Sequence, residues 1–162
     1  MGRIVHLVVA VLLTAAVIST VAAAGRGDGL ADAIESGDVA AVRALIKSGV
    51  DVNQRSGDGS TALLWAAHTS NVEIARALIA AKAAVDTPND FGVTPLLEAS
   101  RNGDAPMVDL LLWSGADPKR AHPEGETPLL SASRAGSVAV VRLLLARGAD
   151  VNTAEAFNRR RR

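Results

Sequence analysis

The chain has 162 residues, of which 49% are hydrophobic and only 2% aromatic, and it contains no cysteine, which excludes disulfides, thiolate nucleophiles and cysteine-based zinc sites. Basic and acidic residues number 17 each, but five of the basic ones are Arg3 and the four arginines at 159–162, so the body carries a surplus of about five negative charges. An acidic body argues against a nucleic-acid partner, because phosphates are bound by clustered lysine and arginine.

The first segment has the pattern of a secretory signal peptide. A short basic start at residues 1–3 precedes a nearly continuous apolar stretch at 4–21, and three alanines offer an A-x-A cleavage site before Gly25. We therefore expect residues 1–24 to be a signal peptide and the mature protein to be periplasmic or secreted. The alternative is an uncleaved membrane anchor, since the apolar stretch approaches the roughly 20 residues that span a bilayer. A mature chain beginning near Gly25 would exclude the anchor.

After a predicted flexible linker at residues 25–29, the sequence repeats every 33 residues. The unit reads G-x-T-[PA]-L-L, then a short Ala/Ser-rich helix, then V-x-x-[VA]-x-x-L-[LI], then a G-A-D-like turn. Such a period indicates stacked supersecondary units, none of which buries its apolar face alone. We expect a repeat domain over 30–152. Its four units, of which the first lacks the opening turn, are 30–53, 54–86, 87–119 and 120–152.

Each unit is predicted to contain two short helices with defined ends. The first helices can be capped by the side-chain oxygens of Thr61, Thr94 and Thr127. The second helices start after four residues of good N-cap type, which are Asp38, Asn71, Asp104 and Ser137. They end at Gly49, Gly115 and Gly148, but at Lys82 in the second unit. A side chain in this left-handed position should cost on the order of 1 kcal/mol.

In these motifs the chain resembles the ankyrin repeat family, whose unit is a β-turn followed by two antiparallel helices with a T-P-L-H core. The resemblance covers roughly residues 30–152, and it departs from the motif where histidine is replaced by Leu64, Leu97 and Leu130. It implies an all-α solenoid of about four helix–turn–helix units with short β-hairpin loops.

No catalytic constellation stands out in the sequence. Beyond the predicted signal peptide the histidines are His68 and His122, in different units, and there is no Ser/His/Asp spacing, zinc-type His pair or paired-carboxylate motif. We therefore expect neither enzymatic activity nor a cofactor. An accessory factor carrying a metal would require His68 and nearby carboxylates to converge.

Positions at which the units differ mark the candidate binding surface. In the family that the chain resembles, hairpin tips and first helices form a concave face that binds a partner protein. The matching tip residues are Asp58, Ser60, Asp90, Phe91, Val93, Glu124 and Glu126. Those on the first helices are Trp65, His68, Glu98, Arg101, Ser131 and Arg134.

Among the aromatic residues, Trp65 and Phe91 are the predicted partner anchors, with packing between adjacent units as the alternative. Trp113 is expected to cover the convex packing layer instead. The sequence thus predicts a scaffold without chemistry that binds a protein partner, with acidic tips favouring a basic patch. An inhibitor or immunity protein that caps a toxic enzyme, and a membrane-tethered scaffold, are alternatives.

The last unit keeps the apolar pattern of an internal copy, with no polar substitution for an exposed end. Residues 153–162 begin another hairpin and then end in arginines, so we interpret them as the truncated start of a further repeat with an Arg tail. An Arg tail that binds acidic surfaces is the alternative. We expect a monomer, with self-association through the uncapped last unit as a second outcome.

Overall fold

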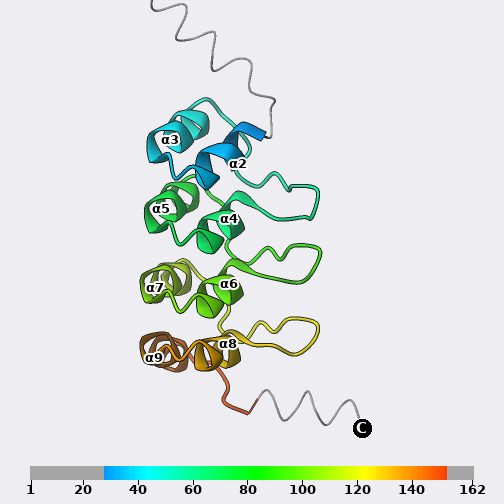
Figure 1. Ribbon diagram of the computed structural model, residues 1–162, viewed down its shortest axis with the longest axis vertical. Coiled ribbons are helices and arrows are strands. Elements are labelled where there is room, and N and C mark those ends of the chain that lie inside the picture. Colours follow the sequence, from blue (N-terminus) through cyan, green and yellow to red (C-terminus); the bar gives the residue numbers. More distant parts are fainter. Residues whose placement is uncertain (1–27, 153–162) are drawn as a thin grey trace, which may run out of the picture.

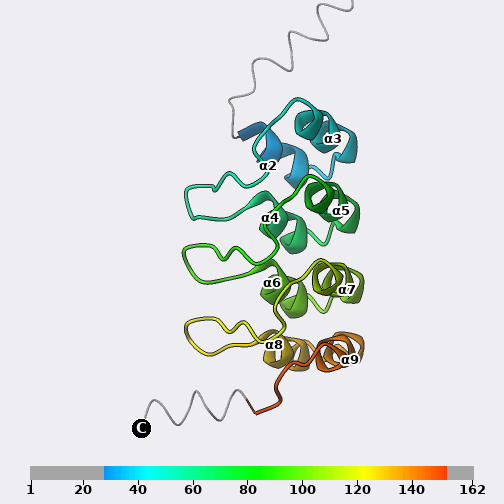
Figure 2. The same ribbon diagram turned by 180° about the vertical axis from the view of Figure 1, so that it is seen from behind.

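The computed structural model describes residues 28–152, and all regular elements in this range are helices. They are α2 (Asp28–Glu35), α3 (Val39–Lys47), α4 (Ala62–His68), α5 (Val72–Ala80), α6 (Pro95–Arg101), α7 (Ala105–Trp113), α8 (Pro128–Arg134) and α9 (Val138–Ala146). The even-numbered helices form one column of the stack and the odd-numbered helices the other (Figure 1). Loops before α4, α6 and α8 extend away from the column of even-numbered helices (Figures 1 and 2). The predicted all-α solenoid of four helix pairs is confirmed.

The predictions made for the two ends of the chain stay untested. The predicted signal peptide at 1–24, linker residues 25–27 and the predicted truncated repeat at 153–162 lie outside the described residues. Among the described residues, the first helix begins at Asp28, two residues before the expected start of the repeat domain. Over residues 28–152, no helix has the length and apolar character needed to cross a membrane.

The predicted helix starts are confirmed by their hydrogen bonds. Thr94 caps α6, since its Oγ1 accepts a bond from the Leu97 N–H at 3.2 Å. Thr61 and Thr127 do the same for α4 and α8. In the other column the side chains of the four predicted caps accept bonds from the third residue of each helix. Each cap satisfies a backbone donor that the helix itself cannot satisfy.

The outer helices also end as predicted, in a left-handed residue. The φ angles are +87° at Gly49, +97° at Gly115 and +84° at Gly148, and Lys82 takes the same conformation at +69°. In all four units the next N–H returns to a carbonyl five residues earlier, as Ala83 does to Leu78 at 2.9 Å. This is the pattern of a Schellman cap, which favours glycine because a Cβ is strained there.

The core consists of small and branched side chains repeated at the 33-residue interval. In the inner column, the first-helix alanines Ala66, Ala99 and Ala132 are fully buried. Leu78, Leu111 and Leu144 are fully buried in the outer column. Because α6 packs on both α4 and α8, and α7 on α5 and α9, every internal unit buries apolar surface against two neighbours.

The loops between units are turns rather than ladders of strands. Each full loop is closed by two backbone bonds, which in the second loop are those from Asn89 N–H to the Val93 carbonyl at 3.0 Å and from Gly92 N–H to the Asn89 carbonyl at 2.9 Å. In the described chain the only bridge is the isolated antiparallel pair of Arg55 and Thr61. The expected β-hairpins are therefore reduced to hairpin-shaped turns, because each arm is too short for a ladder.

Two side chains clamp neighbouring units together behind these loops. Asn53 Oδ1 accepts a bond from the Ala84 N–H at 2.7 Å, and one unit later Asp86 accepts from the Asp117 N–H at 3.0 Å. The corresponding residue at the third boundary is Lys119, whose side chain has no acceptor atom. The last unit is thus joined without this clamp.

The C-terminal side of the last unit leaves apolar surface uncovered by the described residues. Leu145 is 42% exposed, whereas Leu112 at the same position of the previous unit is 6% exposed. A groove of about 240 Å³ beside it is lined by Leu129, Leu130 and Val141 among others. Self-association through this end stays a prediction.

Trp113 does not cover the convex packing layer, so that expectation is wrong. Its side chain is 74% exposed, and the Arg147 guanidinium lies 4.5 Å from the centre of its ring. The reason is the phase of α7, in which Leu111 and Leu112 take the buried positions and turn the following residue outward.

We expect Lys82→Gly to raise the free energy of unfolding by about 1 kcal/mol, because it relieves left-handed strain at a surface position. The reciprocal change Gly115→Lys should lower it by a similar amount, since a Cβ at Gly115 meets no atom within 4 Å and only backbone strain is added. Urea unfolding of both variants measures the difference. If both variants had the same free energy of unfolding as the wild type, the left-handed residue after the outer helix would not contribute to the stability of either unit.

Candidate binding surface

The face that carries the predicted binding residues is formed by the loops at 54–61, 87–94 and 120–127 together with α4, α6 and α8; we call it the inner face. The loops and this column of helices lie on the same side of the stack (Figures 1 and 2). All thirteen predicted site residues belong to these elements. The structure gives them different environments.

At the first tip, the predicted residues are bonded to each other. The Asp58 carboxylate accepts bonds from the Ser56 hydroxyl, from the Ser60 N–H at 3.0 Å and from the Ser60 hydroxyl at 2.8 Å. These bonds, that of Ser56 first, lower the pKa of Asp58 to about 2. Ser60 is only 6% exposed. Asp58 is therefore held ionised, while Ser60 serves mainly to hold it.

The second tip presents Phe91 to solvent on a braced turn. Asn89 Oδ1 accepts bonds from the N–H groups of Phe91 at 3.2 Å and Val93 at 2.9 Å. Asp90 pairs with Arg55 of the previous loop at 2.8 Å, and its N–H bonds to the Asp58 carbonyl at 3.0 Å. The Phe91 side chain is 66% exposed. A rigid exposed aromatic residue loses little entropy on binding a partner.

At the third tip the two predicted glutamates separate. Glu124 is exposed, and its N–H bonds to His122 Nδ1 at 3.1 Å. Glu126 turns back toward the helices, where its side chain is 21% exposed. Only Glu124 remains freely presented to solvent.

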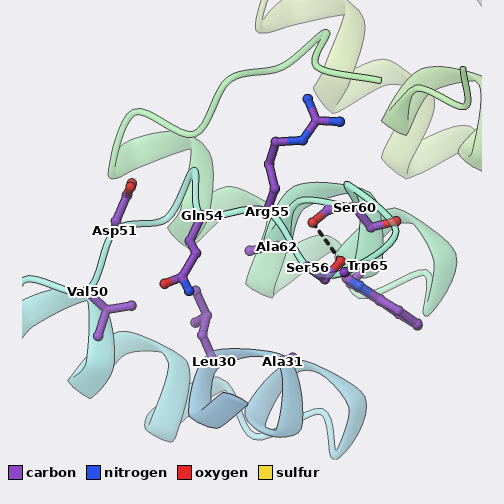
Figure 3. A pocket seen from close by; sticks show the side chains of 11 residues that line it. Leu30, Ala31, Val50, Asp51, Gln54, Arg55, Ser56, Ser60, Ala62 and Trp65 are labelled. Atoms are coloured by element: carbon purple, nitrogen blue, oxygen red, sulfur yellow. Dashed lines mark hydrogen bonds between the residues drawn. The ribbon is translucent and has the colours of Figure 1, made fainter. Parts of the chain in front are cut away.

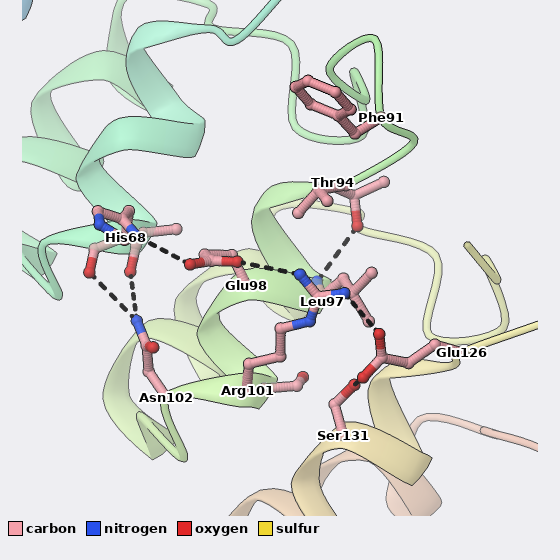
Figure 4. Close-up of polar contacts among 12 residues, drawn as sticks. His68, Phe91, Thr94, Leu97, Glu98, Arg101, Asn102, Glu126 and Ser131 are labelled. Atoms are coloured by element: carbon pink, nitrogen blue, oxygen red, sulfur yellow. Dashed lines mark hydrogen bonds and ion pairs between the residues drawn. The ribbon is translucent and has the colours of Figure 1, made fainter. Parts of the chain in front are cut away.

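A polar network crosses three units over the inner helices (Figure 4). His68 Nδ1 lies 2.8 Å from Glu98 Oε1, and Arg101 joins Glu98, at 3.6 Å, to Glu126. The Ser131 hydroxyl donates to Glu126 at 2.9 Å, and Arg134 lies 3.6 Å from the same carboxylate. The Arg101 guanidinium is the main cause of the lowered pKa of Glu126, and Glu126 in turn raises the pKa of Arg101.

This network brings together half of the predicted residues and one that the sequence did not indicate. Asn102 Nδ2 donates to the carbonyls of Ala67 and His68 at 3.2 Å each, bonding the last residues of α4 to the next unit (Figure 4). The sequence offered little indication of this role, because the residues one repeat before and after Asn102 are Thr69 and Ala135, so the asparagine does not recur. The network fixes the spacing of the inner helices and leaves Glu98 and Glu126 mostly paired.

Trp65 stands between two hollows that the sequence did not predict. It is partly buried against the core, and its ring meets His68 edge to face with centroids 5.8 Å apart. On one side a hollow of about 270 Å³ lies between α2, the segment 50–57 and α4 (Figure 3). On the other, a hollow of about 180 Å³ lies between α4, the second loop and α6. Trp65 thus packs between units and is also available to a ligand in either hollow.

The described inner face offers no metal centre. No group of three or more His, Asp or Glu side chains that could hold a metal ion occurs among residues 28–152. His68 has a single carboxylate neighbour at bonding distance, Glu98. The convergence that a metal-carrying factor would require is not found in this part of the chain.

Comparison with known proteins gives two matches to family models. A model described as ankyrin repeats in three copies matches residues 30–122, and one described as an ankyrin repeat matches residues 124–155. Together they span most of the chain and the same register as the helix pairs. No curated protein matches the chain.

The lowered pKa of Asp58 predicts a pH-dependent contribution to stability. Because its folded value of about 2 lies below the ordinary 3.8, the ionised carboxylate stabilises the fold above about pH 4, and this is lost as the pH falls toward 2. Asp58→Asn lacks this contribution at every pH. The gap in unfolding free energy between wild type and variant, measured with urea, should therefore shrink between about pH 5 and pH 2. A difference in unfolding free energy that stays constant over that range would contradict the lowered pKa of Asp58. The titration of Glu126 contributes equally to both proteins and therefore cancels in the difference.

Proposed function

The chain belongs to the ankyrin repeat family, whose repeats are generally protein–protein interaction modules, and on that premise we propose that it binds a partner protein through the inner face and performs no chemistry. The observation that carries this proposal is the presence of two aromatic residues from successive units on the inner face. Phe91 is 66% exposed on a braced tip, and Trp65 is half-buried beside a hollow that the same loop helps to line. Together they offer apolar surface next to charged groups, as binding hot spots do.

The residues that are free to contact a partner form a subset of the predicted site. Ser60 and Ser131 are buried, and the side chains of Glu98, Arg101 and Glu126 are mostly covered where they form internal pairs. The accessible members are Trp65, His68, Asp90, Phe91, Val93, Glu124 and Arg134, along with the free edge of the Asp58 carboxylate. His68, Asp90 and Arg134 are exposed although each also forms an internal pair. In this proposal the paired residues preorganise the surface and the accessible ones contact the partner.

The surface is preorganised because its loops are bonded to one another as well as to the helices. The Arg55–Asp90 pair and the bond from Asp90 N–H to the Asp58 carbonyl join the first two tips. The network from His68 to Arg134 fixes the helices below them. Since little ordering remains to be done on association, a modest contact area is sufficient for binding.

Affinity capture with three immobilised proteins tests the proposal. Partners of the wild type should be retained by Trp113→Ala, which removes an exposed aromatic residue from the outer column. They should be lost or reduced at least tenfold with Trp65→Ala plus Phe91→Ala, in line with the roughly 2 kcal/mol or more that a hot-spot residue contributes. Phe91→Ala alone leaves the core untouched and separates lost binding from lost stability, which thermal unfolding monitors for Trp65→Ala. Equal capture by all three proteins, or a loss confined to Trp113→Ala, would refute the inner face as the binding surface.

A further inference from the structure

The smaller hollow beside Trp65 combines an apolar wall with acidic groups. Its lining includes Leu64, Trp65 and Val93 on the apolar side, and Asp58 and Glu98 among the polar residues. At about 180 Å³ it has room for one long side chain rather than for a small-molecule cofactor. The lining comes from two successive units, so the hollow exists only when the units are stacked.

The charges around this hollow do not balance. Glu98 is paired with His68 and Arg101, Glu126 with Arg101 and Arg134, and Asp90 with Arg55. Asp58, in contrast, forms no ion pair within residues 28–152, since its bonds come from two hydroxyls and a backbone N–H. Three of the roughly four lone-pair sites of a carboxylate are thereby used, which leaves one acceptor site open. The low pKa of Asp58 keeps this group negatively charged.

We propose that this hollow, which we call the basic-residue pocket, receives one arginine side chain of the partner protein. The aliphatic part of that side chain lies along Leu64 and Val93, and its guanidinium stacks against the Trp65 ring and donates to Asp58, the lining carboxylate that has no internal ion pair. This inference rests on the proposed function and names the chemistry of the partner at one position.

The alternatives fit the lining less well. An acidic side chain would meet two carboxylates, and a purely apolar one would leave the charge of Asp58 desolvated without a partner, at a cost. Arginine is favoured over lysine because its planar group stacks on an aromatic ring while its fork of donors reaches the carboxylate beside that ring. The surplus of about five negative charges in the body of the chain also favours a basic partner.

A titration with small probes tests the pocket without knowledge of the partner. N-acetyl-arginine methylamide is added to the ¹⁵N-labelled protein, and N-acetyl-citrulline methylamide serves as its neutral isostere. We expect a saturable shift of the Trp65 indole N–H with the arginine probe, and at least a fivefold weaker response with the citrulline probe, since a charged hydrogen bond is lost. The Trp113 indole, already covered by Arg147, is the internal reference and should not respond.

Two variants separate the local contact from general charge. Asp58→Asn keeps an oxygen for the bonds from the Ser56 hydroxyl and the Ser60 N–H, and it should weaken arginine binding at least fivefold. Glu73→Gln removes one charge from α5 in the outer column, away from the inner face, and should leave binding unchanged. Equal shifts with the two probes on wild type, or an equal response of the Asp58→Asn protein, would overturn the proposal. The probe contrast on wild type needs no variant and holds even where a variant is destabilised.

The outcome is independent of the test of the proposed function. If capture depends on Trp65 and Phe91 but the arginine probe does not bind, the binding face stands and the chemistry assigned to the pocket is wrong. If the probe binds at Trp65 and capture does not depend on the inner face, the pocket stands and its role in partner binding is wrong.

Discussion

Packing of the inner helices across the unit boundaries is the contact on which the rest of the structure depends. Ala66, Ala99 and Ala132 are fully buried and add no bulk, so α4, α6 and α8 can pack closely in one column. That stacking places successive loops above one another, which permits the Arg55–Asp90 pair and the bond between the second and first tips. Without it, neither the polar network nor the basic-residue pocket would form, since both combine side chains of different units.

Rigidity of the inner face is a second consequence of the same packing. A short unit cannot fix its own loop, but each tip here is bonded internally and most are bonded to a neighbour. The result is an array whose charged groups are held at set positions before any partner arrives. A binding protein built in this way depends on preorganised shape and charge more than on the number of its contacts.

Features that depend on one unit could be predicted from the sequence, whereas features that join units could not. The N-caps and the left-handed ends of the outer helices, Lys82 included, follow from local backbone geometry, so residue type at a fixed repeat position is enough to place them. The environment of Ser60 and the hollows beside Trp65 depend on how two loops and two helices meet, which the period does not encode. The prediction for Trp113 was wrong because this residue lies at the edge of the buried face of α7, where helical spacing alone permits either a buried or an exposed side chain. Leu111 and Leu112 occupy the buried positions, so Trp113 points outward.

Native-state hydrogen exchange of Leu111→Ala tests most directly whether packing between units holds the inner face together. Leu111 is fully buried in α7, far from the tips, and its truncation should cost roughly 2 to 5 kcal/mol. The account predicts that amide protection falls in the third and fourth units, including the Val93–Asn89 turn and the His122–Glu126 turn, while α4 and α5 retain most of theirs. Loss of protection confined to α7, with both turns unchanged, would show that the inner face is ordered independently of the stack and would contradict the account.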